Sequence, residues 1–457
     1  MLYKPAEHFD EALQRILFFN QIMWQTRHRL NGLGRLDLIL NDLYKNDIYK
    51  DYLTKELASQ MVRDFLIQLS KYSKYKSDAL VGDIGQIIVL GGLEIDGTYF
   101  CNELTEIFLK EQAKLGKPDP KTILRVSRKM PKGILKVAVE CLSSKTGSPL
   151  FSNDDVVIPT LLDFGIEEID AYQYCTSACW EPFIVGKSLD QNNIAVFDFF
   201  AALHKVLNEA KEIKSYEQLV EKYIEHNKIL FQRFLVKINQ LKWAKDPLVS
   251  MFTDGCSEKR LDISEGAALY NHYGITTVAL ANVVDSLLNI KHIVFVNREC
   301  TLVDLNKWRN MNYVGHDAFL KSMQRNKYYG HDGADVVELV ENITNSLSKI
   351  AENYHNRYGG TVKFGLSSPG YNILCKKSSA DTSGRRKGMP YNTHISCLDA
   401  AYTEVINFAA QLDYKHQRFN GNVVDFFIAP LFLEKNRDKF VLFMNESIKI
   451  GFFQMQM

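Results

Sequence analysis

The segment 171–193, AYQYCTSACWEPFIVGKSLDQNN, holds the residues best suited to chemistry. It is uncharged around Cys175 and Cys179, and Glu181 follows two residues after the second cysteine. A thiol beside a carboxylate can transfer a hydrogen atom or a proton, and a carboxylate near a substrate hydroxyl can act as a general base. The small residues indicate a tight loop. On this segment alone, a different interpretation is favoured: Cys179 packs as a small apolar side chain and Glu181 caps a backbone group.

The composition is that of an ordinary globular protein, with 46% hydrophobic and 24% charged residues in 457. Lys+Arg number 55 against 54 Asp+Glu, so the net charge of +1 indicates neither a nucleic-acid nor a membrane partner. The first 20 residues carry acids before their apolar stretch, unlike a secretory signal. Eight cysteines are too sparse for a disulfide scaffold. We therefore expect reduced thiols and a cytoplasmic location.

The hydrophobic pattern alternates between helical and strand-like segments. It predicts helices over 8–24, 51–72 and 102–116, a buried strand over 86–92, a helix running into a strand over 279–295, and a long helix over 332–358 closed by Gly359. Strands that alternate with helices indicate an α/β fold with mainly parallel pairing. No linker rich in Pro, Gly or Ser divides the chain, so one continuous architecture is expected.

The spacing of the residues does not match the metal-binding and cofactor-binding motifs that we compared with it. GLGRLD (32–37) lacks the third glycine of a dinucleotide fingerprint. Cys175 and Cys179 are four apart with no third cysteine near, so a zinc or iron–sulfur site lacks ligands. His316–Asp317 and His331–Asp332 lie in polar segments rich in Gly and Asn, where turn and capping roles are commoner. We therefore expect no bound metal or cofactor.

A series of segments spread over nearly the whole chain shares its order with a known family. They are FDEALQ (9–14), GLGRLD (32–37), VLGGLEIDGTYFCNELT (89–105), LRVSRKMP (124–131), GSPLFSNDDVVIPTLLDFGIEEIDAYQY (147–174), ACWEP with the GK that follows (178–187), SMFTDGCSEKRLDISEGAALYN (250–271), ANVVDSLLNIKHIVF (281–295), KYYGHDGADV (327–336), ADTSGRRKGMPYN (380–392) and GFFQMQM (451–457). Each is modestly specific alone, but their shared order is highly specific. By these segments the chain resembles the glycyl radical enzymes of the pyruvate formate-lyase-like superfamily.

The resemblance implies an α/β fold in which a ten-stranded barrel of two half-barrels is surrounded by helices, with 1–457 as its core domain. A finger loop, about residues 172–190, enters the barrel with Cys179, which matches the cysteine whose thiyl radical takes hydrogen from substrate. Glu181 matches the carboxylate of the family's Gly-Cys-x-Glu pattern and would be the general base. The implied function is a glycyl-radical-type lyase that breaks a C–O, C–N or C–C bond of a small metabolite in anaerobic metabolism.

Three further residues are candidates for substrate contact: Cys175, Asn153 and Asn193. For Asn153, capping the following helix is at least as good a role, and for Cys175 packing of the loop is preferred. Asn193 stands about where the diol dehydratases carry Asp, which weakens a glycerol or propanediol assignment. Ala178 stands where pyruvate formate-lyase itself has a second cysteine, which argues against acyl transfer.

The run Arg385, Arg386, Lys387 could attract an anionic group. Such runs are typical of a solvated loop, and that interpretation is preferred.

The family's glycine motif, Arg-Val-x-Gly-Tyr, does not occur in the sequence. We therefore expect a protein glycyl radical from a missing or separate domain, installed by a radical S-adenosylmethionine activating enzyme, and little turnover without it. Three explanations for the missing motif stay open: the chain is a fragment, a split enzyme, or a shortened member that has lost catalysis. The expected partners are a small-molecule substrate, the activating enzyme, a separate glycyl radical polypeptide and a second copy in a homodimer. The alternatives are a pyruvate formate-lyase-type formate C-acetyltransferase and a non-catalytic scaffold for an intact paralogue.

Overall fold

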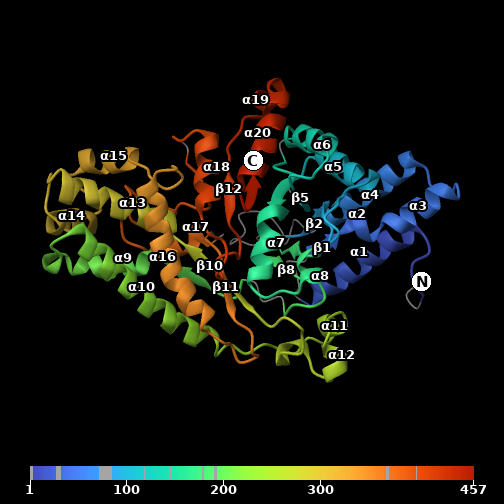
Figure 1. Cartoon of the computed structure of the whole chain (residues 1–457), viewed down its shortest axis with the longest axis horizontal. Helices are drawn as coiled ribbons and strands as arrows, with labels where there is room; N and C mark the ends of the chain where they lie inside the picture. Colours follow the sequence, from blue (N-terminus) through green and yellow to red (C-terminus); the bar gives the residue numbers. More distant parts are fainter. Residues whose placement is uncertain are drawn as a thin grey trace. The chain divides into compact units, whose positions relative to one another are not determined.

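The computed structural model describes residues 4–26, 32–71, 85–117, 119–144, 146–177, 180–189, 193–366, 370–397 and 399–457. The chain divides into two compact units, which are described separately (Figure 1). Unit 1 comprises Met1–Gly186 and Asp425–Met457, and unit 2 comprises Lys187–Val424. The sequence predicts one core domain over 1–457, and this remains a prediction next to the observed division into two units.

Unit 1 is an α/β unit built on a largely parallel sheet. Its helices are α1 (Phe9–Gln25), α2 (Leu36–Ile39), α3 (Asn41–Tyr49), α4 (Lys55–Ser70), α5 (Glu103–Leu115), α6 (Lys132–Leu142), α7 (Asp154–Asp163), α8 (Glu168–Ala171), α19 (Pro430–Lys435) and α20 (Arg437–Ile450). Its strands are β1 (Gly32–Arg35), β2 (Ile87–Leu90), β3 (Gly92–Leu93), β4 (Tyr99–Phe100), β5 (Lys121–Val126), β6 (Leu150–Asn153), β7 (Cys175–Thr176), β8 (Pro182–Phe183) and β13 (Gln454–Gln456). The predicted helices over 8–24, 51–72 and 102–116 and the strand over 86–92 are confirmed.

The main sheet has the strand order β1-β2-β5-β6-β13-β12, where β12 (Val423–Asp425) is the strand by which the chain returns to unit 1. The first four strands are parallel and β13 is antiparallel to β6. Parallel neighbours need a crossover connection, and α5 lies between β2 and β5 in the chain as α6 lies between β5 and β6. Helices α4, α5 and α6 pack side by side along these crossovers (Figure 1). The mainly parallel pairing is confirmed.

Helix α5 shows how local sequence sets the ends of an element. The Asn102 side chain accepts the backbone N–H of Thr105 at 3.0 Å, and the Thr105 hydroxyl oxygen accepts the backbone N–H of Asn102 at 3.0 Å. These reciprocal bonds satisfy two N–H groups that a helix start leaves open. Gly116 ends the helix at a φ of 63°, which glycine adopts without strain. The predicted stop at Gly116 is therefore confirmed.

A fully buried ion pair joins the centre of the sheet to α7. Arg125 on β5 donates from Nε to Asp154 Oδ1 at 2.8 Å and from Nη2 to Asp154 Oδ2 at 2.9 Å. Its Nη1 donates to the carbonyl oxygens of Tyr172 at 2.9 Å and Tyr174 at 3.2 Å. Asp154 also accepts the Tyr174 hydroxyl at 2.7 Å and the Leu93 N–H at 2.7 Å. The pair thus carries the hydrogen bonds that a buried pair needs to offset its desolvation.

Of the two adjacent glycines after β2, the second makes room for the guanidinium of this pair and the first for Tyr99. Gly92 has a φ of 124°, and a Cβ atom there would lie 2.7 Å from the Arg125 guanidinium. Any side chain at this position would therefore both strain the backbone and displace the buried cation. Gly91 has a φ of 65°, and its Cβ would lie 2.7 Å from the Tyr99 hydroxyl.

Unit 2 is built around the three-stranded parallel sheet β11-β10-β9. Its strands are β9 (Val196–Asp198), β10 (Tyr273–Val278) and β11 (Val362–Phe364), and its helices are α9 (Phe200–Asn208), η3 (Ala210–Glu212), α10 (Tyr216–Ile238), α11 (Pro247–Ser250), α12 (Cys256–Lys259), η4 (Ile263–Glu265), α13 (Leu280–Ile290), η5 (Lys291–Val296), α14 (Leu302–Asn310), α15 (Asp317–Arg325), α16 (Ala334–Glu352), α17 (Tyr371–Leu374), η6 (Cys375–Lys377) and α18 (Tyr402–Gln411). Helix α10 packs against α9 and α16 (Figure 1). Phe197 of β9 meets Phe231 of α10 edge to face at a ring-centroid distance of 5.1 Å, and Phe231 meets Phe364 of β11 at 5.9 Å.

Three local predictions for unit 2 were wrong. Residues 279–295 do not end in a strand, because α13 continues into the π-helical η5. Every residue of α13 is buried, and this packing outweighs the strand propensity of the few β-branched residues in η5, of which Ile293 is buried. Helix α16 ends at Glu352, where the Asn353 amide donates to the Lys349 carbonyl at 2.7 Å, well before Gly359. Arg385 does not lie in a solvated loop, because it is buried and pairs with Asp381 at 2.6 Å.

The remaining described strands form the hairpins β3–β4 and β7–β8. The α/β class is confirmed, and the closed ten-stranded barrel stays a prediction. No helix that the structure describes is long and apolar enough to cross a membrane.

The buried pair predicts a large effect of a small substitution. Asp154→Asn leaves the Arg125 charge buried without a carboxylate, so we expect a loss of about 3–5 kcal/mol in the free energy of unfolding. Chemical denaturation followed by circular dichroism measures this loss. Glu106→Gln is the matched control, because Glu106 pairs with Lys110 on the surface and such pairs contribute about 0–1 kcal/mol. Equal losses in the two variants would contradict the structural role of the pair.

Candidate functional site

The described residues 175–177 and 180–183 form a hairpin in unit 1. Strands β7 and β8 are antiparallel, with Cys175 opposite Phe183. The Ser177 N–H donates to the Glu181 carbonyl at 2.9 Å, and the Trp180 N–H donates to the Ser177 carbonyl at 3.2 Å. These bonds link the two described sides of the predicted tight loop, which itself stays a prediction. Ala178 and Cys179 fall between Ser177 and Trp180 in the chain and lie outside the described residues.

Glu181 is the chemical group that the hairpin holds in place. Its side chain is 1% exposed, and the Ser177 hydroxyl donates a hydrogen bond to Glu181 Oε2. A buried carboxylate is costly unless it is hydrogen-bonded, so this donor stabilises it where it lies. In the sequence this carboxylate follows Cys179 by two residues.

Neighbouring elements of unit 1 fix the position of the hairpin. Gln454 on β13 donates from Nε2 to the Trp180 carbonyl at 2.6 Å. Gly32 on β1 lies so close to the hairpin that a Cβ atom would be 2.9 Å from the Thr176 carbonyl oxygen. The Arg125 guanidinium binds the Tyr174 carbonyl immediately before β7. The first glycine of GLGRLD thus serves close packing, a role that its sequence context did not reveal.

Cys175 is buried on β7, and burial raises the pKa of its thiol to about 11. The nearby Arg125 and Arg35 act in the opposite direction but do not outweigh burial. The thiol is therefore protonated at neutral pH and is a poor nucleophile. Its position fits the packing role preferred from the sequence.

The two asparagine candidates lie in different units. Asn153 caps α7 by accepting the Asp155 N–H at 3.2 Å, and its amide donates to the Ile448 carbonyl at 3.1 Å. The capping role of Asn153 is confirmed. Asn193 belongs to unit 2, where its exposed side chain accepts the Thr276 hydroxyl at 3.0 Å.

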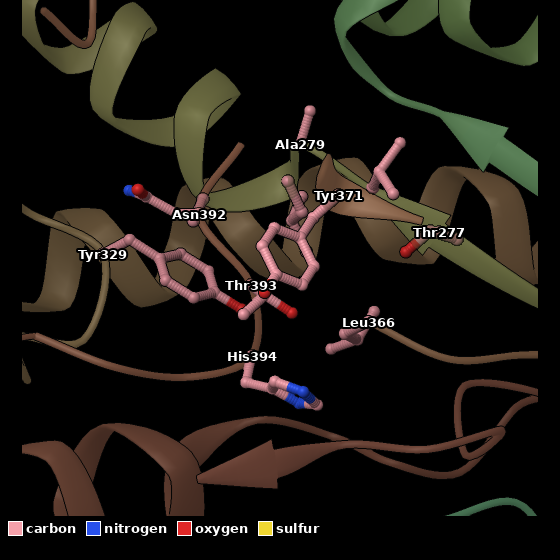
Figure 2. Close-up of a pocket in the computed structure, with 11 residues that line it drawn as sticks. Thr277, Ala279, Tyr329, Leu366, Tyr371, Asn392, Thr393 and His394 are labelled. Atoms are coloured by element: carbon pink, nitrogen blue, oxygen red, sulfur yellow. The ribbon is translucent and has the colours of Figure 1, made fainter. Parts of the chain in front are cut away.

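Unit 2 has a narrow hollow at the carboxyl end of β10, the edge at which parallel α/β sheets carry ligand sites. Figure 2 shows Tyr329, Tyr371 and His394 around the same space. The hollow offers about 10 Å³, which is room for a single water. Sequence reasoning missed these residues, because they come from separate segments and meet only in the folded unit.

No group of three or more His, Cys, Asp or Glu in the described ranges could hold a metal ion. The segment supplies the carboxylate of Glu181, the hydroxyl of Ser177 and cysteine thiols. These groups suit proton and hydrogen-atom transfer.

Comparison with known proteins places this geometry in a family. The pyruvate formate lyase-like family model matches residues 1–376. (2S)-3-sulfopropanediol dehydratase of Klebsiella oxytoca is 23% identical over 418 residues, which cover 85% of this chain and 51% of the relative. Trans-4-hydroxy-L-proline dehydratase of Clostridioides difficile is 24% identical over 438 residues, which cover 87% and 54%. The chain thus spans about half the length of these curated relatives.

Solved structures share the fold over nearly the whole chain. A structure describing 1,2-propanediol dehydration in Roseburia inulinivorans superposes with a TM-score of 0.92 at 24% identity, covering 99% of this chain and 62% of the other. A glycyl radical enzyme from Archaeoglobus fulgidus gives 0.89 at 25% identity, with the same two coverages. Since the family model matches most of the residues and the fold agrees throughout, the chain belongs to the pyruvate formate lyase-like family, whose members include glycyl radical dehydratases and lyases.

Proposed function

We propose that the chain is the core of a glycyl radical lyase that removes a group from a small hydroxylated, amino or carboxylated metabolite. Cys179 is the residue that exchanges hydrogen with the substrate, and Glu181 is the general base. The observation that carries the proposal is the buried Glu181, which the Ser177 hydroxyl and a closed hairpin hold two residues from Cys179. The cytoplasm, where thiols stay reduced, is the proposed location.

The proposed reaction divides between these two residues. A protein glycyl radical, installed by a radical S-adenosylmethionine activating enzyme, supplies the initial hydrogen abstraction from the thiol. Cys179 then takes hydrogen from the substrate carbon that bears the hydroxyl. Glu181 accepts the hydroxyl proton as the neighbouring group leaves. Cys179 finally returns a hydrogen atom to the product, and the protein's part is to position the groups and exclude side reactions.

Two observations favour elimination over acyl transfer. The curated relatives include dehydratases for a sulfonated diol and for hydroxyproline. Ala178 precedes Cys179, so the pair of adjacent cysteines expected of pyruvate formate-lyase itself is not present. The substrate-contact roles of Cys175, Asn153 and Asn193 stay predictions, as do the homodimer and a separate glycyl radical polypeptide.

Substitution of the cysteine tests the proposal most directly. Anaerobic activation of the chain, together with a polypeptide that carries the glycyl radical motif, should give a carbon-centred doublet in electron paramagnetic resonance and product formation. We expect Cys179→Ala to abolish turnover while the doublet persists, because the radical is stored on a glycine. Cys300→Ala, a cysteine of unit 2, is the matched control and should retain activity. The proposal fails if Cys179→Ala turns over normally.

Glu181 and Ser177 should differ in the size of their effect. Glu181→Gln removes the base, so we expect kcat to fall about 10²- to 10⁴-fold. Ser177→Ala removes one donor to the carboxylate and should lower kcat about tenfold or more with little change in KM, and Ser177→Thr should restore most of it. Steady-state kinetics of the reconstituted enzyme measures these values. Glu168→Gln, an exposed carboxylate on α8, is the control. Unchanged kinetics in Glu181→Gln would favour the non-catalytic scaffold.

A further inference from the structure

Unit 2 contains a cavity of about 440 Å³, within the size range of small-molecule sites. Side chains from α9, from α14 and from residues 374–387 surround it. The lining residues are Asp198, Phe200, Ala201, His204, Arg309, Asn310, Asn312, Leu374, Lys377, Ser378, Ser379, Ala380 and Lys387. None of them belongs to the hairpin of unit 1, so a role for this cavity does not rest on the proposed function.

Arg309 is the buried cation of this cavity, with 1% of its surface exposed. Its Nε and Nη2 donate to Asn306 Oδ1 at 3.0 and 2.7 Å. Its Nη1 donates to His204 Nδ1 at 3.1 Å, to Ser379 Oγ at 2.9 Å and to the Ala380 carbonyl at 3.2 Å. All these acceptors are neutral, so the guanidinium is hydrogen-bonded but its charge is not neutralised by direct contact.

The other buried arginines provide the comparison within the same chain. In the described ranges five arginines are buried. Four of them pair with a carboxylate: Arg35 with Glu94 at 2.6 Å, Arg125 with Asp154 at 2.8 Å, Arg385 with Asp381 at 2.6 Å and Arg418 with Glu341 at 2.7 Å. Arg309 is the exception, and it is also the one that lines the cavity. Asp381 favours the charged guanidinium from a distance but pairs directly with Arg385. A buried charge without a carboxylate in contact is costly, so a bound anion would supply the direct counter-charge.

Two lysines add positive charge to the same cavity. Lys377 and Lys387 are exposed, and neither makes an ion pair with a carboxylate of the described residues. Lys387 is the one member of the basic run 385–387 that lines the cavity, because Arg385 pairs with Asp381 and Arg386 pairs with Asp317 at 2.6 Å. The lining thus carries three cations and one carboxyl group, Asp198.

The neutral groups of the cavity are arranged as hydrogen-bond partners. Since a guanidinium only donates, His204 Nδ1 must accept from Arg309, which leaves the ring proton on Nε2. Burial and the nearby Arg309 lower the pKa of His204, so the ring stays neutral at pH 7. Burial raises the pKa of Asp198 to about 6, with Phe200 N–H, Tyr391 hydroxyl and Arg385 opposing it. Asp198 is therefore mostly ionised at neutral pH and can accept a bond from a ligand hydroxyl.

We propose that this cavity binds the phosphate group of a small hydroxylated metabolite, with Arg309, Lys377 and Lys387 as the charged contacts and Asp198 as the hydroxyl acceptor. A phosphate carries nearly two negative charges and several acceptor oxygens at pH 7, which suits one guanidinium, two ammonium groups and the Ser378 and Ser379 hydroxyls. Free inorganic phosphate has the same chemistry, and the experiment separates the two sources.

Isothermal titration of the full chain at low ionic strength with glycerol 3-phosphate, inorganic phosphate and glycerol tests this site. We expect glycerol 3-phosphate to bind, inorganic phosphate to bind more weakly, and glycerol not to bind. Lys377→Gln with Lys387→Gln should weaken binding of the phosphates about a hundredfold, because each of the two lost charge-assisted bonds is worth about tenfold. Both lysines are exposed, so this variant should fold as the parent does.

Lys376→Gln is the matched control, since Lys376 is the exposed neighbour of Lys377 and does not line the cavity. Arg309→Gln should abolish binding, with circular dichroism reporting whether the buried substitution leaves the fold intact. If inorganic phosphate and glycerol 3-phosphate bind with equal affinity, the site is assigned to free phosphate. The proposal is overturned if neither phosphate binds, or if Lys376→Gln weakens binding as much as the double variant does.

Discussion

The buried pair between Arg125 and Asp154 is the interaction on which unit 1 depends. It joins β5, the start of α7, and the chain just before the hairpin through contacts of 2.7–3.2 Å. Removing one partner would leave a charge in a dry interior, so these segments are bound to one arrangement. The glycine at position 92 follows from the same constraint, since a Cβ atom there would meet the guanidinium. A requirement for charge balance in the core thus determines where the hairpin begins.

The position of the hairpin in turn determines the position of the Glu181 carboxylate. Because the Arg125 guanidinium holds the Tyr174 carbonyl and Gln454 holds the Trp180 carbonyl, both ends of the segment are fixed by backbone contacts. Contacts to these two carbonyl oxygens do not depend on the side chains that the hairpin carries. The curated relatives include a dehydratase of a sulfonated diol and a dehydratase of hydroxyproline. Specificity must come from residues that other elements bring to the site.

The sequence could predict what depends on neighbours in the chain. The strand at 86–92 and the helix stop at Gly116 follow from local residue types. It could not predict contacts between residues far apart, such as Arg309 with His204, 105 positions away, or Ser379 with His204, 175 away. The strand expected near 293 failed for the same reason, because burial of α13 overrides the preference of a few β-branched residues.

The same electrostatic rule distinguishes the two buried cations of greatest interest. Arg125 has a carboxylate in bidentate contact, so its charge is balanced within the fold and its role is structural. Arg309 has the same burial, but its hydrogen bonds go to an amide, an imidazole, a hydroxyl and a carbonyl, which satisfy its donors without cancelling its charge. Four of the five described buried arginines pair with carboxylates. The fifth lies on the wall of a cavity with two further cations, so its counter-charge would be supplied by an anion from solution. Burial of arginine is therefore evidence of a ligand site only where the carboxylate partner is missing and the cavity is present together.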